Sequence, residues 1–246
     1  MVKAQSISSQ CESALAGVLT DSGAACLNPT GLIPILQASN DTSLIAPLNT
    51  WDQAMCKSSV CTNATLASVT SDITSGCQTE LGSLGLGNIS SAELTTIVQQ
   101  LYPSVREILC SQDTSNNTLC PTEFLTNLQS VTGTFTLASA ETFLNQVVSS
   151  GVPNIPKSVE CTDCTKQWYN IIKAAFPDVV SSDAESNVSG TCGSDFVNGQ
   201  TPSDVAAFGT SGSSTSGDTS GAASTHVDAR RAFVAVAVLS PLVALL

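Results

Sequence analysis

Cysteine is the residue type with the most chemical potential in this chain, and it occurs ten times in 246 residues. Cysteines can bind a metal, exchange electrons or close disulfides, and their spacing separates these roles. A four-thiolate zinc site needs two C-x2-C pairs, whereas the sequence contains only Cys161 and Cys164 at that spacing. A redox role for this pair would need a strand-to-helix context that the sequence does not indicate. We therefore predict structural disulfides, with no metal and no cofactor, in a protein that folds in an oxidising compartment.

The histidine base that nucleophilic catalysis by Ser or Cys usually needs is missing from the region that we expect to fold. The one histidine, His226, lies in the C-terminal tail, so a Ser-His-Asp or Cys-His system would lack its base. Residues 82–87 read GSLGLG but lack the flanking residues of a phosphate-binding loop. Paired carboxylates can hydrolyse glycosides, although solvated helix faces explain the acidic residues here more simply. The candidate carboxylates are Glu80, Glu93, Glu107, Glu123 and Asp163. We predict that the protein is not an enzyme, with a paired-carboxylate enzyme as the alternative.

The segments that must hold the cysteines have the apolar spacing of amphipathic helices. Ser90 and Glu93 form a capping box, Pro121 suits a first helical turn, and Pro103 should kink or split its helix. Long alternations of β-branched residues are absent, so the sequence predicts an all-α fold. The expected helices cover residues 11–19, 44–56, 91–109, 121–128, 138–148 and 165–176, and the expected loops lie near residues 82–89, 150–158 and 198–224.

The cysteines fall into two groups of five with the same order: two single residues, a close pair, and a final single residue. The first group reads C-x14-C-x29-C-x4-C-x15-C and the second reads C-x9-C-x40-C-x2-C-x27-C. We interpret this order as a diverged duplication. Residues 8–81 are then the first helical repeat, residues 82–109 a linker helix region and residues 110–197 the second repeat. Because each group has an odd number, complete pairing requires at least one bridge between the groups.

The two ends of the chain indicate export to the cell surface. We interpret residues 1–7 as the remnant of a leader and the mature N-terminus, because residues 2–4 have the form of a cleavage site. Residues 198–222 are rich in Ser, Thr and Gly and should form a disordered stalk. Residues 223–246 have the spacer and apolar tail of a signal for a glycosylphosphatidylinositol (GPI) anchor, with Ser220 or Gly221 as the attachment residue. The alternative is a short transmembrane tail, although the apolar stretch is shorter than a bilayer requires.

Charge and glycosylation motifs are informative about partners. The net charge of −12 would repel phosphate backbones, so we expect no nucleic-acid partner. The composition, 42% hydrophobic and 11% charged, is not typical of a disordered chain. N-x-S/T motifs are weak signals in a chain this rich in Ser and Thr. They occur at Asn40, Asn63, Asn88, Asn116 and Asn187.

The cysteine order in the first group is similar to that of the elicitins, small secreted helical sterol carriers. The resemblance covers residues 50–81, which contain Cys56, Cys61 and Cys77, and adding Cys11, Cys26 and Cys110 completes six cysteines in elicitin-like order. The first loop is shorter here, and four cysteines have no counterpart. Residues 8–200 as a whole resemble a family of cysteine-rich secreted proteins of filamentous fungi that carry a domain of unknown function. That second resemblance implies a location and no chemistry.

The elicitin resemblance implies a disulfide pairing. If each group follows the elicitin connectivity, its first cysteine pairs with its fifth and its second with its fourth, and the two third cysteines join the groups. The implied pairs are Cys11–Cys77, Cys26–Cys61, Cys110–Cys192, Cys120–Cys164 and Cys56–Cys161. The alternative closes the elicitin-like unit with Cys56–Cys110.

These features leave two non-catalytic functions open. We favour a cell-surface or wall-associated extracellular glycoprotein, held at the outer leaflet of the plasma membrane by its GPI anchor. The alternative is an elicitin-like carrier of a sterol or fatty acid in an apolar cavity between helices. A plain core is the simpler interpretation of the apolar residues, and the 4% of aromatic residues argue against a carbohydrate-stacking surface. The candidate pocket residues are Leu44, Leu48, Met55, Leu66, Val69, Ile73, Ile97 and Leu101.

Overall fold

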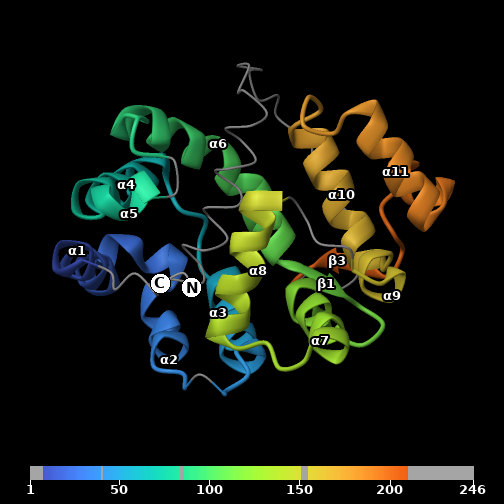
Figure 1. Cartoon of the computed structure of the whole chain (residues 1–246), viewed down its shortest axis with the longest axis horizontal. Coiled ribbons are helices and arrows are strands. Elements are labelled where there is room, and N and C mark those ends of the chain that lie inside the picture. The colour runs from blue at the N-terminus through green and yellow to red at the C-terminus, as the bar shows by residue number, and fades with distance from the viewer. Residues whose placement is uncertain (1–7, 40, 84–85, 151–154, 210–246) are drawn as a thin grey trace.

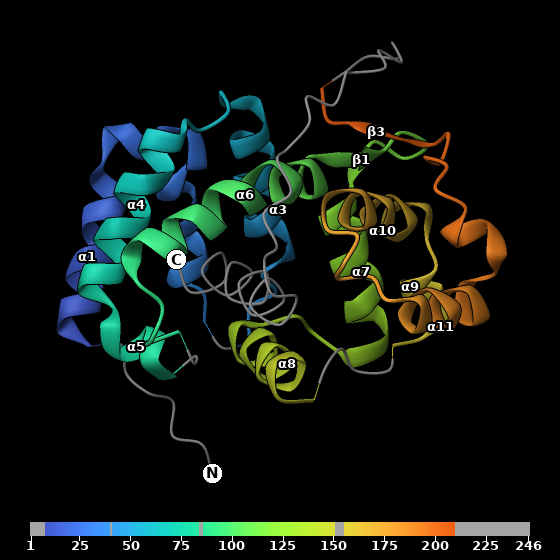
Figure 2. The ribbon, with the colours of Figure 1, turned by 90° about the horizontal axis from the view of Figure 1, so that it is seen from above.

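The computed structural model describes residues 8–39, 41–83, 86–150 and 155–209 of the chain (Figure 1). Helices form most of this part, and five disulfides link them, so the predicted all-α, disulfide-stapled fold is confirmed. The N-terminal part (residues 8–110) and the C-terminal part (residues 111–209) lie side by side, and within the C-terminal part the helix of residues 137–150 lies on the side nearer the N-terminal part in Figure 2.

The N-terminal part is a set of helices, and three of its four longer helices start at a side-chain cap. Ser8 and Thr62 each accept a hydrogen bond from the backbone N–H three residues later, and Ser90 and Glu93 form the predicted capping box. The four longer helices are α1 (Ser9–Thr20), α3 (Ile45–Lys57), α4 (Asn63–Gly76) and α6 (Ser91–Leu109). The short elements are the 3₁₀ helices η1 (Ser22–Leu27) and η2 (Pro29–Leu32) and the helices α2 (Ile33–Leu36) and α5 (Gln78–Ser83).

Helices α1 and α4 approach each other closely because Gly76 lacks a side chain. A Cβ atom at position 76 would overlap the Cβ of Ala14. Val18 of α1 packs with Val69 and Ile73 of α4 in one buried cluster, which also contains the Cys11–Cys77 disulfide. The same end of the helix pair is therefore held both by packing and by a covalent bond.

The C-terminal part combines helices with a small antiparallel sheet of order β2-β1-β3. Strand β1 pairs with both neighbours, since Gln112 lies opposite Leu119 on one side and Ala206 on the other. The strands are β1 (Ser111–Asp113), β2 (Thr118–Leu119) and β3 (Val205–Ala207). The helices are α7 (Cys120–Thr132), α8 (Leu137–Ser150), α9 (Lys157–Glu160), α10 (Asp163–Ala175), α11 (Ser182–Cys192) and the 3₁₀ helix η3 (Ser194–Val197).

Polar contacts join the two parts along α3. The backbone N–H of Leu44 donates to the Phe135 carbonyl over 2.8 Å, and the Thr122 hydroxyl donates to the Asn49 side chain over 2.8 Å. Gln129 accepts a hydrogen bond from Ser43 and another from the Phe135 N–H. The segment that follows α7 is therefore fixed against the start of α3.

The sheet was not predicted, and one of its strands lies in the segment expected to be a disordered stalk. The prediction is wrong for residues 198–209, because β3 pairs with β1 and buries Val205. Further hydrogen bonds run from Thr114 N–H to the Asp204 carbonyl and from Phe208 N–H to the Cys110 carbonyl. Backbone pairing with a distant strand has no local sequence signal, so the short apolar run at residues 205–208 did not by itself indicate a strand. Residues 210–222 of the expected stalk lie outside the described residues.

Helix α6 continues through Pro103 as one helix of 19 residues, so the proline does not split it. Leu101, two residues earlier, is buried, and Tyr102 and Arg106 bind the segment that follows α3. These contacts on both sides of the proline compensate for its missing N–H.

The structure corrects two of the five disulfide pairs implied by the elicitin resemblance. Cys11–Cys77, Cys26–Cys61 and Cys120–Cys164 form as implied. Cys56 pairs with Cys110 instead of Cys161, because α6 brings its C-terminal end beside the end of α3. Cys161, just before α10, instead pairs with Cys192 at the end of α11. All ten cysteines are paired, and Cys56–Cys110 is the required bridge between the two groups of five.

Candidate functional site

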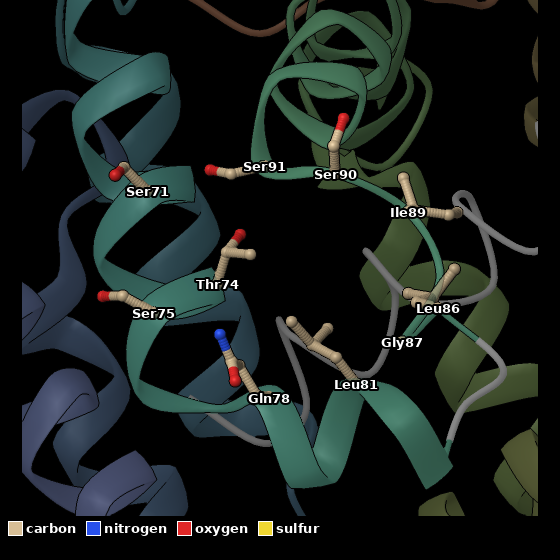
Figure 3. Close-up of a pocket in the computed structure, with 10 residues that line it drawn as sticks. All are labelled: Ser71, Thr74, Ser75, Gln78, Leu81, Leu86, Gly87, Ile89, Ser90 and Ser91. Carbon is tan, nitrogen blue, oxygen red and sulfur yellow. The ribbon is translucent and has the colours of Figure 1, made fainter.

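A pocket of about 500 Å³ lies between α4, α5 and the N-terminus of α6, and Figure 3 shows its lining. Three segments of chain contribute to it: the second half of α4, the start and middle of α5, and the loop that leads into α6. The lining residues are Ser71, Thr74, Ser75, Gln78, Leu81, Leu86, Gly87, Ile89, Ser90 and Ser91. The volume lies within the range of small-molecule sites, about 300–1,000 Å³.

Local structure fixes these segments. Helix α5 follows directly after Cys77, whose disulfide with Cys11 holds the end of α4. The loop then folds back, because Leu86 N–H donates to the Leu81 carbonyl over 2.8 Å and Ile89 N–H donates to the Leu86 carbonyl over 3.0 Å. The capping box that opens α6 completes the rim.

The lining has a polar side and an apolar side. Thr74 and Ser91 point into the space between the helices in Figure 3, and the exposed Gln78 lies beside Leu81 on α5, while Leu81 and Leu86 form the buried apolar part of the lining. The Thr74 hydroxyl donates its hydrogen to the Thr70 carbonyl and so presents lone pairs to a ligand. The side chains of Gln78 and Ser91 make no hydrogen bond within the described part of the chain, which leaves their donors open. None of the ten lining residues carries a charge.

The eight residues predicted for a lipid pocket lie elsewhere, in separate packed clusters. Leu44 and Met55 pack around Trp51, with Leu48 against that cluster. Leu66 packs against the Cys26–Cys61 disulfide in a second cluster. Val69 and Ile73 belong to the cluster between α1 and α4. Leu101 is buried and Ile97 is half-buried on α6, and none of the eight residues lines the pocket of Figure 3. The structure therefore does not bring the eight side chains together around this pocket.

The candidate carboxylates are dispersed, and each has a structural partner or a solvated position. Glu80 accepts a hydrogen bond from Ser8 N–H over 2.8 Å, which lowers the pKa of this carboxyl. Glu93 closes the capping box of α6. Glu107 and Asp163 are exposed, and Asp163 is the first residue of α10. Of the five candidates, Glu123 is the one that lies beside a second carboxyl group.

Glu123 in the first turn of α7 lies within hydrogen-bonding reach of Asp113 at the end of β1, a residue that the sequence did not single out. Partial burial and the neighbouring Asp113 raise the pKa of Glu123. Burial acts to raise the pKa of Asp113 as well, but hydrogen bonds from Ser115, Glu123 and Asn116 lower it overall. The two groups can therefore share a proton. Glu123 also lies 3.6 Å from the sulfur of Cys164, so the pair adjoins a disulfide.

The most deeply buried carboxyl belongs to Asp52 on α3, which is 3% exposed. Burial raises its pKa to about 8, and the charge of Arg106 only partly opposes this effect. Its Oδ1 lies 3.7 Å from the sulfur of Cys56. Asp52 is thus mostly protonated at neutral pH and adjoins the bridge between the two cysteine groups. The sequence offered no signal for it, because a single acid on an amphipathic helix is usually solvated.

The predicted glycosylation asparagines that the structure describes are all exposed: Asn63, Asn88, Asn116 and Asn187. At the tip of the β1–β2 hairpin, the Asn116 amide donates to Asp113 over 2.8 Å and accepts from Thr118 N–H over 2.8 Å. Asn40 and the anchor attachment candidates Ser220 and Gly221 lie outside the described residues.

One group of potential metal ligands occurs among the described residues, formed by Cys11, Cys77 and Glu80. Both of its sulfurs belong to the same disulfide and cannot act as thiolate ligands. The group is therefore a poor metal site.

Comparisons with known proteins return no relative. No protein-family model, curated protein or solved structure matches this chain. Within the described residues, the structure contains no helix with the length and apolar character that crossing a membrane requires.

Proposed function

We propose that this chain is a non-catalytic extracellular glycoprotein of the cell surface or cell wall, held at the outer leaflet by a GPI anchor. The observation that carries the proposal is that all ten cysteines are in disulfides. Disulfides form and persist in oxidising compartments, so these five fit an extracellular location.

The chain outside the described residues supports the finer part of the proposal. Small residues at 220–222, a polar spacer and an apolar stretch at 232–246 follow the order of an anchor signal. The four exposed N-x-S/T asparagines are accessible for glycans. The net charge of −12 favours a well-solvated surface.

The non-catalytic part of the proposal is supported by the surroundings of the acidic side chains. The pair of Asp113 and Glu123 adjoins the tip of the β1–β2 hairpin and the Cys120–Cys164 disulfide, and neither residue lines the pocket of Figure 3. The carrier alternative lacks comparable support, because six of its eight candidate residues pack in three separate clusters and none of the eight lines the pocket.

The test is release of the protein from the surface of the cells that produce it. Treatment with a phosphatidylinositol-specific phospholipase C should move the protein into the supernatant, where an antibody against the folded part detects it. A chain with Leu at both positions 220 and 221 is the control, because bulky residues block attachment of the anchor. Protein that stays on the cells after lipase treatment, or that the cells secrete freely without the substitutions, would contradict the anchor.

A further inference from the structure

We propose that the pocket between α4, α5 and the N-terminus of α6 binds a neutral saccharide. Its lining combines the hydroxyl and amide groups of Thr74, Gln78 and Ser91 with the apolar side chains of Leu81 and Leu86 (Figure 3). A sugar ring has hydroxyl groups at its edge and C–H groups on its faces, so it matches both sides of this pocket at once.

The charges around the pocket select against an anionic ligand. No Lys, Arg or His lines it, although it includes the first residues of a 19-residue helix. That helix end is already occupied, because Glu93 accepts hydrogen bonds from the backbone N–H and the hydroxyl of Ser90, and the Ser90 hydroxyl accepts one from Glu93 N–H. Asp72, exposed on α4 between lining residues, adds a negative charge nearby. A phosphate or a uronic acid would therefore meet repulsion without a compensating cation.

The hydrogen-bonding groups select against an apolar ligand. A sterol or fatty acid in this space would remove the half-buried Ser91 hydroxyl from water without replacing its hydrogen bonds, which costs free energy. A saccharide offers both donors and acceptors to the side chains of Gln78 and Ser91. Because no aromatic side chain lines the pocket, binding rests on hydrogen bonds and contact with Leu81, Leu86 and Ile89, and we expect it to be weak.

The pocket is separated along α6 from the point where the chain leads toward the anchor, a step that rests on the proposed function. The pocket lies at the N-terminal end of α6, and the opposite end leads through Cys110 into β1. Phe208 is the residue before Gly209, where the described part of the chain ends. Its N–H donates to the Cys110 carbonyl over 2.7 Å. A helix of 19 residues is about 28 Å long. The segment that leads to the proposed anchor thus leaves the described part of the chain near the C-terminal end of α6, and the pocket lies at the N-terminal end of the same helix.

Saturation-transfer difference NMR on the purified full chain tests the binding. The neutral probes are maltotriose, cellotriose and laminaritriose; trigalacturonic acid is the anionic probe, and a fluorescent sterol, followed by its emission, is the apolar one. We expect saturable binding of at least one neutral trisaccharide and none of the other two probes. Ser91→Phe, which fills the pocket, and Gln78→Ala, which removes the amide, should each weaken binding by about tenfold or more.

Two neighbouring residues provide matched controls. Ala92→Phe adds the same ring to the same turn of α6, and Thr79→Ala truncates the residue next to Gln78, but neither position lines the pocket. Both controls should bind like the unmodified chain, and all variants should keep their far-UV circular dichroism. The proposal is overturned if no neutral trisaccharide binds, if Ser91→Phe binds as well as Ala92→Phe, or if the anionic probe or the sterol competes for the site. Because the assay uses purified protein, its failure leaves the lipase-release result unaffected.

Discussion

Arg106 of α6 donates a 2.6 Å hydrogen bond to the backbone carbonyl of Ser58, in the segment that follows α3. The same guanidinium donates to the Cys56 carbonyl over 3.3 Å and to the Tyr102 hydroxyl over 3.4 Å. The Tyr102 hydroxyl in turn accepts from Cys61 N–H over 3.0 Å. One turn of α6 thus holds the short segment between Cys56 and Cys61, two cysteines that bridge to different parts of the chain.

Replacing Arg106 should destabilise the protein. Arg106→Ala removes charge-assisted hydrogen bonds to two backbone carbonyls, and we expect it to lower the free energy of unfolding by about 2 to 4 kcal/mol. Arg106→Lys keeps the charge but loses the forked geometry, so its effect should be intermediate. Urea denaturation followed by tryptophan fluorescence measures both variants. Equal midpoints for Arg106→Ala and the unmodified chain would show that these hydrogen bonds do not stabilise the fold.

Asp52 should make the stability fall as pH rises through the neutral range. Its pKa is about 8 in the folded protein against an ordinary value of 3.8, so both states are protonated below about pH 4. Between pH 4 and 8 the unfolded chain ionises while the folded chain stays protonated, and the folded state loses stability accordingly. Asp52→Asn removes this titration, so it should flatten the pH dependence and raise stability at pH 8 by on the order of a few kcal/mol.

Urea midpoints measured between pH 4 and pH 8 check this expectation. Asp72→Asn, which neutralises an exposed acid on α4, is the control and should leave the slope of stability against pH nearly unchanged. A slope for Asp52→Asn equal to that of the control would mean that the buried carboxyl is ionised in the folded state.

Local signals predicted six of the longer helices, because helix starts depend on neighbouring residues, but they did not predict α4 or α11. The capping box of Ser90 and Glu93 and the start of α7 near Pro121 are as the sequence indicates. Long-range relationships were not predictable in the same way. Strand β3 exists because Val205 and its neighbours pair with residues more than ninety positions earlier, and the sequence around Val205 does not indicate that pairing.

The candidate site shows the same division. The apolar residues predicted to line a pocket instead pack in the core, because an amphipathic helix buries its apolar face against neighbouring helices. The pocket of Figure 3 is lined instead by residues such as Thr74 and Gln78, which have no distinctive pattern in a chain rich in Ser and Thr. The loop after α5 reaches the pocket because it folds back onto Leu81, a contact that the sequence does not indicate.

The two disulfide pairings make opposite predictions for a double substitution. In the structure, Cys161 pairs with Cys192, so Cys161→Ser with Cys192→Ser should leave no free thiol. The pairing implied by the elicitin resemblance would instead leave Cys56 and Cys110 free, giving two thiols per chain. Thiol titration of the denatured, unreduced variant distinguishes the two outcomes, with Cys56→Ser plus Cys110→Ser as the reciprocal variant. The bridge closes a loop over a sequence separation of 31, so its loss should also lower stability by about 3 to 4 kcal/mol.

The close approach of α1 and α4 should make Gly76 intolerant of even a methyl group. Gly76→Ala places a Cβ against the Cβ of Ala14, and forcing the helices apart should cost about 1 to 3 kcal/mol. Ala14→Gly removes the opposing methyl, so Gly76→Ala should cost far less in that background, and a double-mutant cycle by urea denaturation gives the coupling directly.

Gly17, on the same helix as Ala14, is the matched control for this contact. A Cβ at position 17 would meet no heavy atom within 4 Å, so Gly17→Ala should stabilise the protein by about 0.5 to 1 kcal/mol through helix propensity alone. The change in stability is therefore expected to have opposite signs for Gly76→Ala and Gly17→Ala. This difference distinguishes the effect of the close helix contact from that of helix propensity. If Gly76→Ala stabilised the protein as Gly17→Ala does, α1 and α4 would not pack as closely as the structure has them, and the Cys11–Cys77 bridge alone would have to hold their ends together.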